Sequence, residues 1–261
     1  MIFSGAGVYG LIDTHAHLDE IDNLELALIS ARKAGVKAIV AVGQDLNSNE
    51  KNLQLADKYR GFVYAAVGLH PWALAYMGDE QIEENIDFIA ENLNKATALG
   101  EVGLDYHKKI VKETGRDRQQ QVLIRLLQFA RRYDKPVSIH SRYAWKDCLH
   151  LVKEVGIRKV AFHWYTGFSS TLSEILQSGY FISATPAAEY HDEHRRAIKE
   201  APVEQLLLET DCPVEYGRSE RYHAEPADVL RSLKAVASIK GLDEEYIAEC
   251  TTKNARRLFK A

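Results

Sequence analysis

Residues Leu11–Asp19 read L-I-D-T-H-A-H-L-D and place His15 and His17 at the end of an apolar run that begins at Val8. The run is aromatic and β-branched, which is typical of a strand. In a strand, residues i and i+2 point to one face, so both imidazoles can reach one ion, whereas a helix would splay them about 200° apart. Neutral imidazole nitrogen suits transition metals. The stretch therefore predicts a strand that ends in a metal site, with a surface histidine pair near a turn as the alternative.

The composition indicates one α/β unit with no long-range attraction for nucleic acid. The chain has 261 residues, is 46% hydrophobic and contains 6 prolines, so we expect a single domain over residues 1–261. Its formal net charge is −4. Because such a molecule has no overall basic field, any contact with nucleic acid must come from a local patch.

Cysteine usage and hydropathy predict a cytoplasmic protein. The three cysteines, Cys148, Cys212 and Cys250, are widely spaced and form no C-x-x-C motif, which fits a reducing compartment. The N-terminal segment has neither the basic start nor the long apolar run of an export signal. No stretch of about 18 apolar residues suggests a membrane span.

Short apolar runs and helical periodicities alternate eight times along the chain, at intervals of roughly 20 to 40 residues. We expect a helix over Asn49–Tyr59 and a basic loop, Y-H-K-K-I-V-K-E-T-G-R, before a helix over Asp117–Tyr133. Eight such units predict an α/β fold of the TIM (β/α)8 barrel type. A doubly wound open sheet is the alternative, but no G-x-G-x-x-G or phosphate-binding loop motif follows any strand.

Polar residues with metal-binding side chains stand at the ends of the expected strands. The carboxyl ends of all strands meet on one face of a barrel, so residues far apart in sequence come together there. The predicted metal ligands are His15 and His17 from the first strand, Glu101 from the fourth, His140 from the fifth, His163 from the sixth and Asp211 from the eighth.

Each of these residues also has a structural interpretation when it is taken alone. A histidine at a strand end often serves the core or a cap, Glu101 could pair with an arginine, and Asp211 could begin a turn. All of them together are hard to explain in that way, because buried imidazole and carboxylate groups cost free energy unless something compensates them. We therefore predict two divalent ions, one at His15, His17 and Asp211.

The second ion is expected at His140 and His163, with Glu101 bridging the two. Ions about 3.5 to 4 Å apart activate a hydroxide between them and stabilise both the attacking and the leaving oxygen. Mixed imidazole and carboxylate ligands accept Mn or Zn, and Mg more weakly, so the sequence does not define the metal.

Seven segments, in order along nearly the whole chain, resemble the TatD family of metal-dependent hydrolases. They are D-T-H-A-H-L-D, G-L-H-P, G-E-V-G-L-D, P-V-S-I-H-S, H-W-Y-T-G, E-T-D-C-P and N-A-R-R-L-F. The resemblance implies a TIM barrel of the amidohydrolase superfamily, dependence on divalent metal, and deoxyribonuclease or phosphodiesterase activity. It also implies that Glu101 takes the place of the carboxylated lysine that bridges the metals in some relatives.

The chain departs from the family pattern around the expected ligands. Ser141, Arg142 and Tyr143 stand where the family often has Cys-Arg-Asp, and Trp164 and Tyr165 stand where it often has Cys-Phe. The ligands themselves are retained. The departures therefore concern the choice of substrate and not the binding of metal.

The expected reaction is attack on phosphorus by the two-metal-activated hydroxide at the C-terminal face of the barrel. The catalytic residues are predicted to be Asp211, as ligand and proton acceptor, Glu101, and His70, which would orient the substrate at a strand tip fixed by Pro71. His70 could instead only bind a loop carbonyl.

The expected partner is DNA, as single strands or 3′ ends, without sequence specificity. Candidate phosphate contacts are Lys108, Lys109, Lys112, Arg116, Arg142, Arg218 and Arg221. Candidate stacking residues are Trp72, Tyr76, Trp164 and Tyr165. By contrast, Arg131, Arg132 and Lys135 are expected on the opposite face as solvated charges.

Two other functions remain open. The same metal centre would also hydrolyse a small amide, ester or lactone, since it polarises carbonyl as readily as phosphoryl groups. A metal-holding protein without turnover is the third possibility, and the retention of both Glu101 and Asp211 argues against it.

Overall fold

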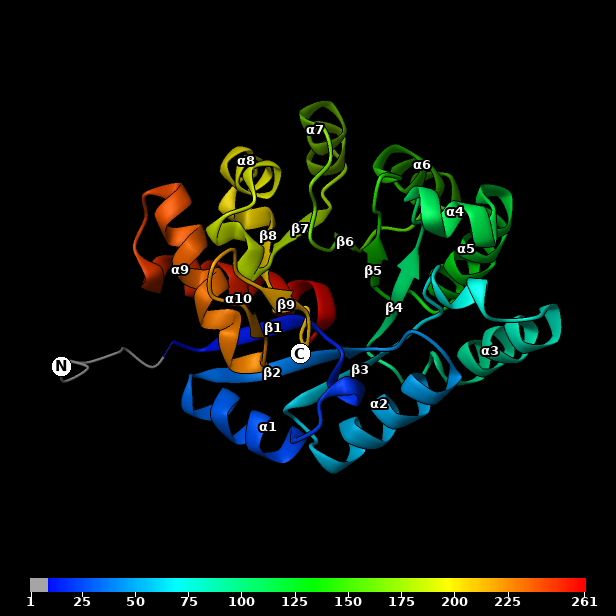
Figure 1. The fold of residues 1–261 in the computed structure, drawn as a ribbon, viewed down its shortest axis with the longest axis horizontal. Coiled ribbons are helices and arrows are strands. Elements are labelled where there is room, and N and C mark those ends of the chain that lie inside the picture. The colour runs from blue at the N-terminus through cyan, green and yellow to red at the C-terminus, as the bar shows by residue number, and fades with distance from the viewer. Residues whose placement is uncertain (1–8) are drawn as a thin grey trace.

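The computed structural model describes residues 9–261, and in this part of the chain eight parallel strands form one sheet whose spatial order follows the chain order. The strands are β1 (Leu11–Ala16), β2 (Val36–Val42), β3 (Val63–Val67), β4 (Ala98–Gly103), β5 (Val137–His140), β6 (Val160–Phe162), β7 (Phe181–Ala184) and β8 (Leu206–Leu208). The expected start of the first strand at Val8 lies outside the described residues. Figure 1 shows the strands at the centre of the molecule and the helices around them.

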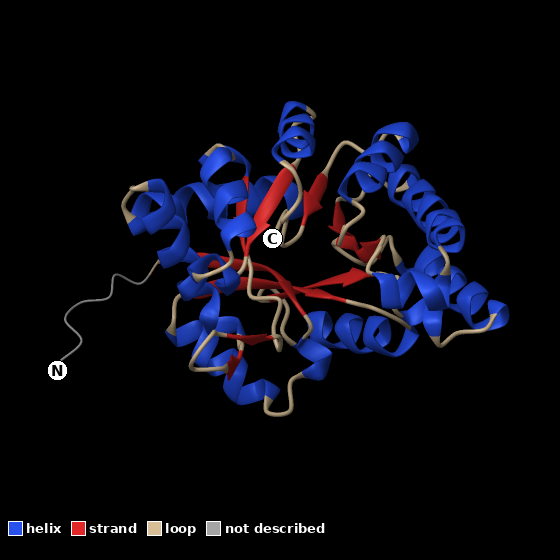
Figure 2. Ribbon diagram, turned by 45° about the horizontal axis from the view of Figure 1, so that its top comes forward, coloured by secondary structure: helices blue, strands red, loops and turns tan. Residues whose placement is uncertain are grey.

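The helices return the chain from the end of one strand to the start of the next. They are α1 (Leu24–Lys33), α2 (Leu46–Lys58), α3 (Asp79–Asn92), α4 (Lys108–Thr114), α5 (Arg116–Arg132), α6 (Trp145–Val155), α7 (Ser169–Gln177), α8 (Asp192–Glu200), α9 (Val229–Lys240) and α10 (Glu244–Phe259). Figure 2 shows the same arrangement from a second direction, with helices outside a central group of strands. The predicted (β/α)8 barrel is confirmed.

The barrel closes where β1 meets the segment that follows β8. The backbone N–H of Asp211 donates to the carbonyl of His15 at 2.9 Å, and the N–H of His17 donates to the carbonyl of Cys212 at 2.8 Å. The buried carboxyl group of Asp13 accepts from the backbone N–H and the hydroxyl of Thr210 at 3.0 and 2.6 Å. Closure of the barrel therefore places Asp211 beside the two histidines of the first strand.

Two apolar clusters stabilise this arrangement. The larger lies between the strands and the surrounding helices, as expected for strands that are buried on both faces. The smaller contains alternate strand residues, among them Ile12, Val40 and Leu207, together with Leu258 and Phe259 of α10. The C-terminal helix is thus part of the packing that fixes the positions of the strand ends.

Three local expectations need correction. The segment expected as a basic loop contains the helix α4, and Gly115, with φ of 69°, separates it from α5. Helix α2 begins at Leu46 and not at Asn49, because the Asp45 carboxylate accepts from the Ser48 backbone N–H at 2.9 Å and caps the helix three residues earlier. A hairpin of β9 (Glu215–Tyr216) and β10 (Tyr222–His223) was not expected at all.

All three cysteines are free thiols. Within residues 9–261, none of the helices combines the length and the apolar character that crossing a bilayer requires.

Candidate metal centre

The six predicted metal ligands lie together at the carboxyl ends of the strands. His15 is in β1 and His17 follows it directly, Glu101 is in β4, His140 ends β5, His163 follows β6 and Asp211 follows β8. All six side chains are buried, with at most 8% of any residue exposed. The barrel thus gathers imidazole and carboxylate groups from five strand ends into one cluster.

Glu101 is at the centre of this cluster, and its two carboxylate oxygens face different histidines. Oε2 lies 3.2 Å from Nε2 of His15 and 3.6 Å from Nε2 of His17. Oε1 lies 2.8 Å from both Nδ1 of His140 and Nε2 of His163. A carboxylate oriented in this way has one oxygen for each of two ions.

The ends of β3 and β4 lie so close together that position 68, beside Glu101, has room only for glycine. A Cβ atom at Gly68 would collide with the backbone of Gly100 and Glu101. Glycine at this position allows the two strand ends to approach closely, which carries the Glu101 side chain toward the axis of the barrel.

Asp211 completes the other half of the cluster. Its Oδ1 lies 3.5 Å from Nε2 of His15 and 3.3 Å from Nε2 of His17. Its backbone has a φ of 52°, which is uncommon for a residue other than glycine. Such positions occur at functional sites when the surrounding structure holds them, as the closure contact with His15 does here.

Each of the four histidines predicted as ligands has a polar side chain near the ring nitrogen that faces away from the cluster, although within residues 9–261 Nδ1 of His163 makes no hydrogen bond. The hydroxyl of Ser138 is 3.1 Å from Nδ1 of His15, and the side-chain amide of Gln44 is 3.0 Å from Nδ1 of His17. Such outer contacts fix the orientation and tautomer of a metal-binding imidazole.

The remaining two partners are carboxylates that sequence reasoning left without a role. Asp105 lies 3.1 Å from Nε2 of His140, and Glu209 lies 3.6 Å from Nδ1 of His163. Both are buried. A signal was present in the sequence, since Asp105 ends G-E-V-G-L-D, while Ser138 and Glu209 precede a ligand by two residues, the spacing that puts side chains on one strand face.

His70 differs from the four ligand histidines. Its Nδ1 accepts a hydrogen bond from the backbone N–H of Trp72 at 3.2 Å, so a neutral ring carries its proton on Nε2. Nε2 lies 3.4 Å from Oε1 of Glu101. Although His70, Glu101 and His140 are close enough to hold an ion, this contact makes His70 a hydrogen-bond donor to the cluster.

The two central carboxyl groups are held in the charged form. Burial alone would raise the pKa of Glu101, but the surrounding imidazoles, His163 foremost, keep it well below its usual value. Burial likewise opposes the charge on Asp211, and its hydrogen bond to His17 and the other imidazoles lower its pKa. Both are thus available as anionic ligands near neutral pH.

The pKa values of the histidines are spread in opposite directions. Burial tends to lower the pKa of His17, yet Asp211 and Glu101 raise it to about 9. Burial lowers the pKa of His70 to about 4, against the weaker attraction of Glu101. Without a metal, His17 therefore carries a proton at neutral pH, and His70 does not.

The donor set fits divalent metal ions. Three groups have ligand atoms within 4.8 Å of one another, namely His15 with His17 and Asp211, His70 with Glu101 and His140, and His15 with His163 and Glu209. The rings of His15 and His163 stack at 4.1 Å, and Nε2 of His163 is only 3.3 Å from Nδ1 of His140. Imidazoles at such distances repel one another when protonated, so crowding favours neutral rings, and these have the free lone pairs that bind a divalent cation next to the carboxylates.

The predicted substrate contacts surround this cluster at different depths. Lys108 and Lys109 are exposed at the start of α4. Arg142 is exposed, and its Nη1 is 3.9 Å from Oδ2 of Asp105. The ring of Trp164 is partly buried against Tyr216, at 5.5 Å.

Two further aromatic predictions have different outcomes. Tyr165 is fully buried, so it cannot stack on a base and the prediction for it is wrong. Trp72 is 41% exposed, and its indole N–H donates to Asp105 at 2.6 Å. Trp72 thus belongs to the wall of the cluster.

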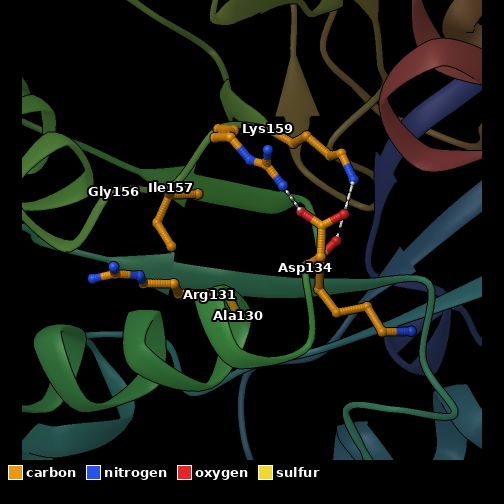
Figure 3. Close-up of a pocket in the computed structure, with 8 residues that line it drawn as sticks. Ala130, Arg131, Asp134, Gly156, Ile157 and Lys159 are labelled. Carbon is orange, nitrogen blue, oxygen red and sulfur yellow. Dashed lines mark hydrogen bonds and ion pairs between the residues drawn. The ribbon is translucent and has the colours of Figure 1, made fainter.

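A second group of charges lies at the opposite end of the barrel, as expected for Arg131 and Lys135. It lines a pocket of about 300 Å³ between the starts of β5 and β6 (Figure 3). The carboxylate of Asp134 accepts from Arg158 at 3.1 Å and from Lys159 at 2.7 Å. These groups are largely exposed, in contrast to the buried histidine cluster.

A family model described as TatD related DNase matches residues 12–260 of the chain. The chain is 35% identical to human "Deoxyribonuclease TATDN3", over 97% of its own length and 96% of that protein. It is 32% identical to the Bacillus subtilis "Uncharacterized metal-dependent hydrolase YabD", over 96% and 99% of the two chains.

Among solved structures, the fold is similar to the crystal structure of YjjV, a TatD homologue from Escherichia coli. The two share 28% sequence identity with a TM-score of 0.87, and the match covers 97% of this chain and 99% of that one.

Proposed function

The chain belongs to the TatD family of metal-dependent hydrolases, and on that premise we propose that it is a deoxyribonuclease that uses two divalent ions. The observation that supports this most strongly is the orientation of Glu101, whose two oxygens face two separate sets of imidazoles. The relative named as a deoxyribonuclease supports a phosphodiester as the bond that is cleaved.

The ions would be held by His15, His17 and Asp211 on one side and by His140 and His163 on the other, with Glu101 between them. When bound, divalent ions lower the pKa of water and polarise the phosphoryl oxygens. We take Mg, Mn or Zn as candidates, because nitrogen and oxygen ligands accept each of them to different degrees.

The protein's own groups would handle protons and orientation. Asp211 is anionic and its Oδ1 faces Nε2 of both His15 and His17 inside the cluster, so it is the group placed to take the proton that water would lose on attack. His70 is neutral and carries its proton on Nε2, which points at Oε1 of Glu101, so it would orient that carboxylate and could turn its one N–H to a substrate oxygen only by giving up this contact. Asp105 would keep the ring of His140 in place, and the carboxylate of Glu209, 3.6 Å from Nδ1 of His163, would attract that ring electrostatically.

DNA would reach this centre along the rim that carries Lys108, Lys109 and Arg142. The three side chains are exposed, and their charges are available for phosphates of the strand. Trp164 would form part of the wall beside the strand. With charge and aromatic surface as the means of binding, we expect single strands and 3′ ends to be accepted without sequence specificity.

The test is degradation of end-labelled single-stranded DNA by metal-stripped protein, with Mg, Mn or Zn added back, in parallel with a Glu101→Ala variant. Metal-restored cleavage by the wild type that Glu101→Ala abolishes supports the proposal, and the fragment ladder gives the polarity. Tight metal binding with intact DNA, but with turnover of a small amide, ester or lactone, overturns it in favour of a small-molecule hydrolase.

A further inference from the structure

Four aromatic rings form a continuous row on the rim of the metal face, which we call the aromatic rim. It consists of His107, Tyr143 and Phe168, from the loops that follow β4, β5 and β6, and of Trp145, the first residue of α6. Neighbouring ring centroids are 6.1 Å apart for His107 and Tyr143, 5.8 Å for Tyr143 and Trp145, and 5.5 Å for Trp145 and Phe168. The row therefore extends across three adjacent loops at the carboxyl ends of the strands.

The row is open to solvent at two of its members. Tyr143 is 56% exposed and Phe168 is 70% exposed, whereas Trp145 between them is partly buried. Single exposed aromatic residues are common on proteins, but linked apolar rings beside a functional site usually mark a surface that a ligand covers.

The backbone holds Tyr143 in an unusual conformation. Its φ is 57°, which is unfavourable for a bulky side chain. The turn is fixed on both sides, since Tyr106 N–H donates to the carbonyl of Arg142 at 2.8 Å and Ala144 N–H donates to that of Ser141 at 3.0 Å. The ring contacts His107 and Trp145 at its edges, yet more than half of the residue stays exposed, so the fixed turn presents part of an aromatic surface to solvent.

The loop that presents Phe168 is also fixed. The hydroxyl of the buried Tyr165 donates to the carbonyl of Phe168 at 2.9 Å, and Arg196 donates to the carbonyl of Gly167. A Cβ atom at Gly167 would collide with the rings of Trp145 and Tyr165, so only glycine lets the loop pass this close. The exposed ring is thus held by buried contacts on its inner side.

The charges around the row indicate what would cover it. The guanidinium of Arg142 lies 5.7 Å from the Tyr143 ring and 3.9 Å from Asp105, which contacts the ligand His140. His107 directly precedes the exposed lysines at the start of α4. A ligand that has flat faces and a negatively charged chain matches both the rings and the cations.

The neighbouring flank would direct such a ligand toward the rim. The hollow of about 730 Å³ between α2 and α3 is lined by Glu50, Asp79, Glu80, Glu83, Glu84, Asp87 and Glu91. Arginines pair with Asp79 and Glu83, but the flank still repels phosphates. The charge distribution favours a path over the loops that follow β4, β5 and β6.

We propose that the aromatic rim stacks unpaired bases of the strand whose phosphodiester lies at the metal centre, and so makes base stacking the basis of strand selection. This inference rests on the proposed nuclease function. Bases in a duplex are already stacked and paired, so their faces are not available to Tyr143 and Phe168. A strand with exposed bases gains stacking on the rim in addition to phosphate contacts.

The test compares two ligands that differ only in their bases. Metal-stripped protein, which lacks the ions that the proposed cleavage requires, is titrated with fluorescent oligothymidylate and with a strand of the same length made of stable abasic sugars. The variants are wild type, the double variant Tyr143→Ala with Phe168→Ala, and Tyr246→Ala, which removes a ring of 45% exposure on α10 as a matched control.

We expect the wild type and Tyr246→Ala to prefer oligothymidylate, and the double variant to lose that preference. Stacking of one base on one ring corresponds to a loss on the order of tenfold in affinity when the ring is removed. Affinity for the abasic strand, and its cleavage after metal is restored, should be equal in wild type and double variant. Tyr143→Trp and Phe168→Trp should retain the preference.

Failure of the stacking proposal and failure of the nuclease proposal would give different results. If the wild type cleaves DNA while the double variant keeps the full preference for oligothymidylate, the aromatic rim does not stack bases and the nuclease proposal stands. If the wild type neither binds nor cleaves either strand, yet turns over a small ester with metal, both proposals are overturned.

Discussion

The two ends of the barrel each carry a carboxylate surrounded by nitrogen groups, and burial distinguishes them. At the carboxyl ends of the strands, Glu101 is 2% exposed among histidines. At the opposite end, the Asp134 side chain is 57% exposed and pairs with Arg158 and Lys159. Water screens the second group and leaves it little influence, whereas the first group is buried, strongly coupled and suited to bind metal.

The change with the largest expected effect is Asp211→Asn. It keeps the size of the side chain but removes the proposed anionic ligand and proton acceptor, so metal-dependent cleavage should fall by roughly a hundred- to ten-thousandfold. Steady-state cleavage of single-stranded DNA at saturating metal measures this. Activity within a fewfold of wild type would remove Asp211 from the proposed mechanism.

Asp105→Asn should have a smaller effect, because Asp105 acts through His140. Loss of such an outer partner typically costs about 10- to 100-fold in metal affinity or activity. Titration of the stripped variant with metal should show weaker binding. Asp147→Asn is the matched control, since Asp147 accepts from Tyr106 at 2.9 Å and contacts no predicted ligand. Equal losses in both variants would contradict the role of Asp105.

In the metal-free protein, the free energy of unfolding should depend on pH through buried titratable groups in and beside the histidine cluster. The pKa of His17 is raised to about 9 by its carboxylate neighbours despite burial, so its stabilising contribution is complete below about 6.5 and is lost as the pH rises through about 9. Burial raises the pKa of Asp13 to about 8, so the folded state retains that proton and stability also falls with rising pH between about 4 and 8.

Denaturant unfolding of stripped protein between pH 6 and 9 should therefore show declining stability, and His17→Gln should flatten the decline. Metal-saturated protein should decline less, because the ion takes the place of the proton. A rise in the stability of the stripped protein over this range would contradict the assigned pKa directions.

The smallest effect is expected for Asp134→Asn at the exposed end. The change breaks two ion pairs that water already screens, so cleavage and metal affinity should stay at wild-type values. Both are measured alongside Asp211→Asn. A clear loss of activity would show that the two ends are coupled in a way that burial does not describe.

The sequence predicted the barrel and the meeting of the six ligands because both follow from periodicity. Strands that end in histidine or carboxylate residues must meet once the barrel closes, wherever they stand in the chain. The features that the sequence did not predict depend on how individual side chains are oriented in the folded protein. Tyr165 carries the same pattern as an exposed stacking residue, but the loop turns it inward, where its hydroxyl donates to the carbonyl of Phe168.

The outer partners were missed for a related reason. The positions of Asp105 and Glu209 in the chain hinted at a role, but assigning that role requires knowing how the imidazoles that they approach are oriented. The hairpin of β9 and β10 is too short to give a period. Periodicity alone also did not predict α4, because its basic residues face solvent as they would in a loop.

The most direct test of the buried cluster is the number of ions that it holds. Stripped protein is titrated with Mn and Zn, and bound metal is counted per chain by equilibrium dialysis for wild type and Glu101→Ala. Two ions in the wild type, and loss of at least one in Glu101→Ala, is the predicted result. A single ion in the wild type, unaffected by Glu101→Ala, would contradict a centre in which this carboxylate joins two metals.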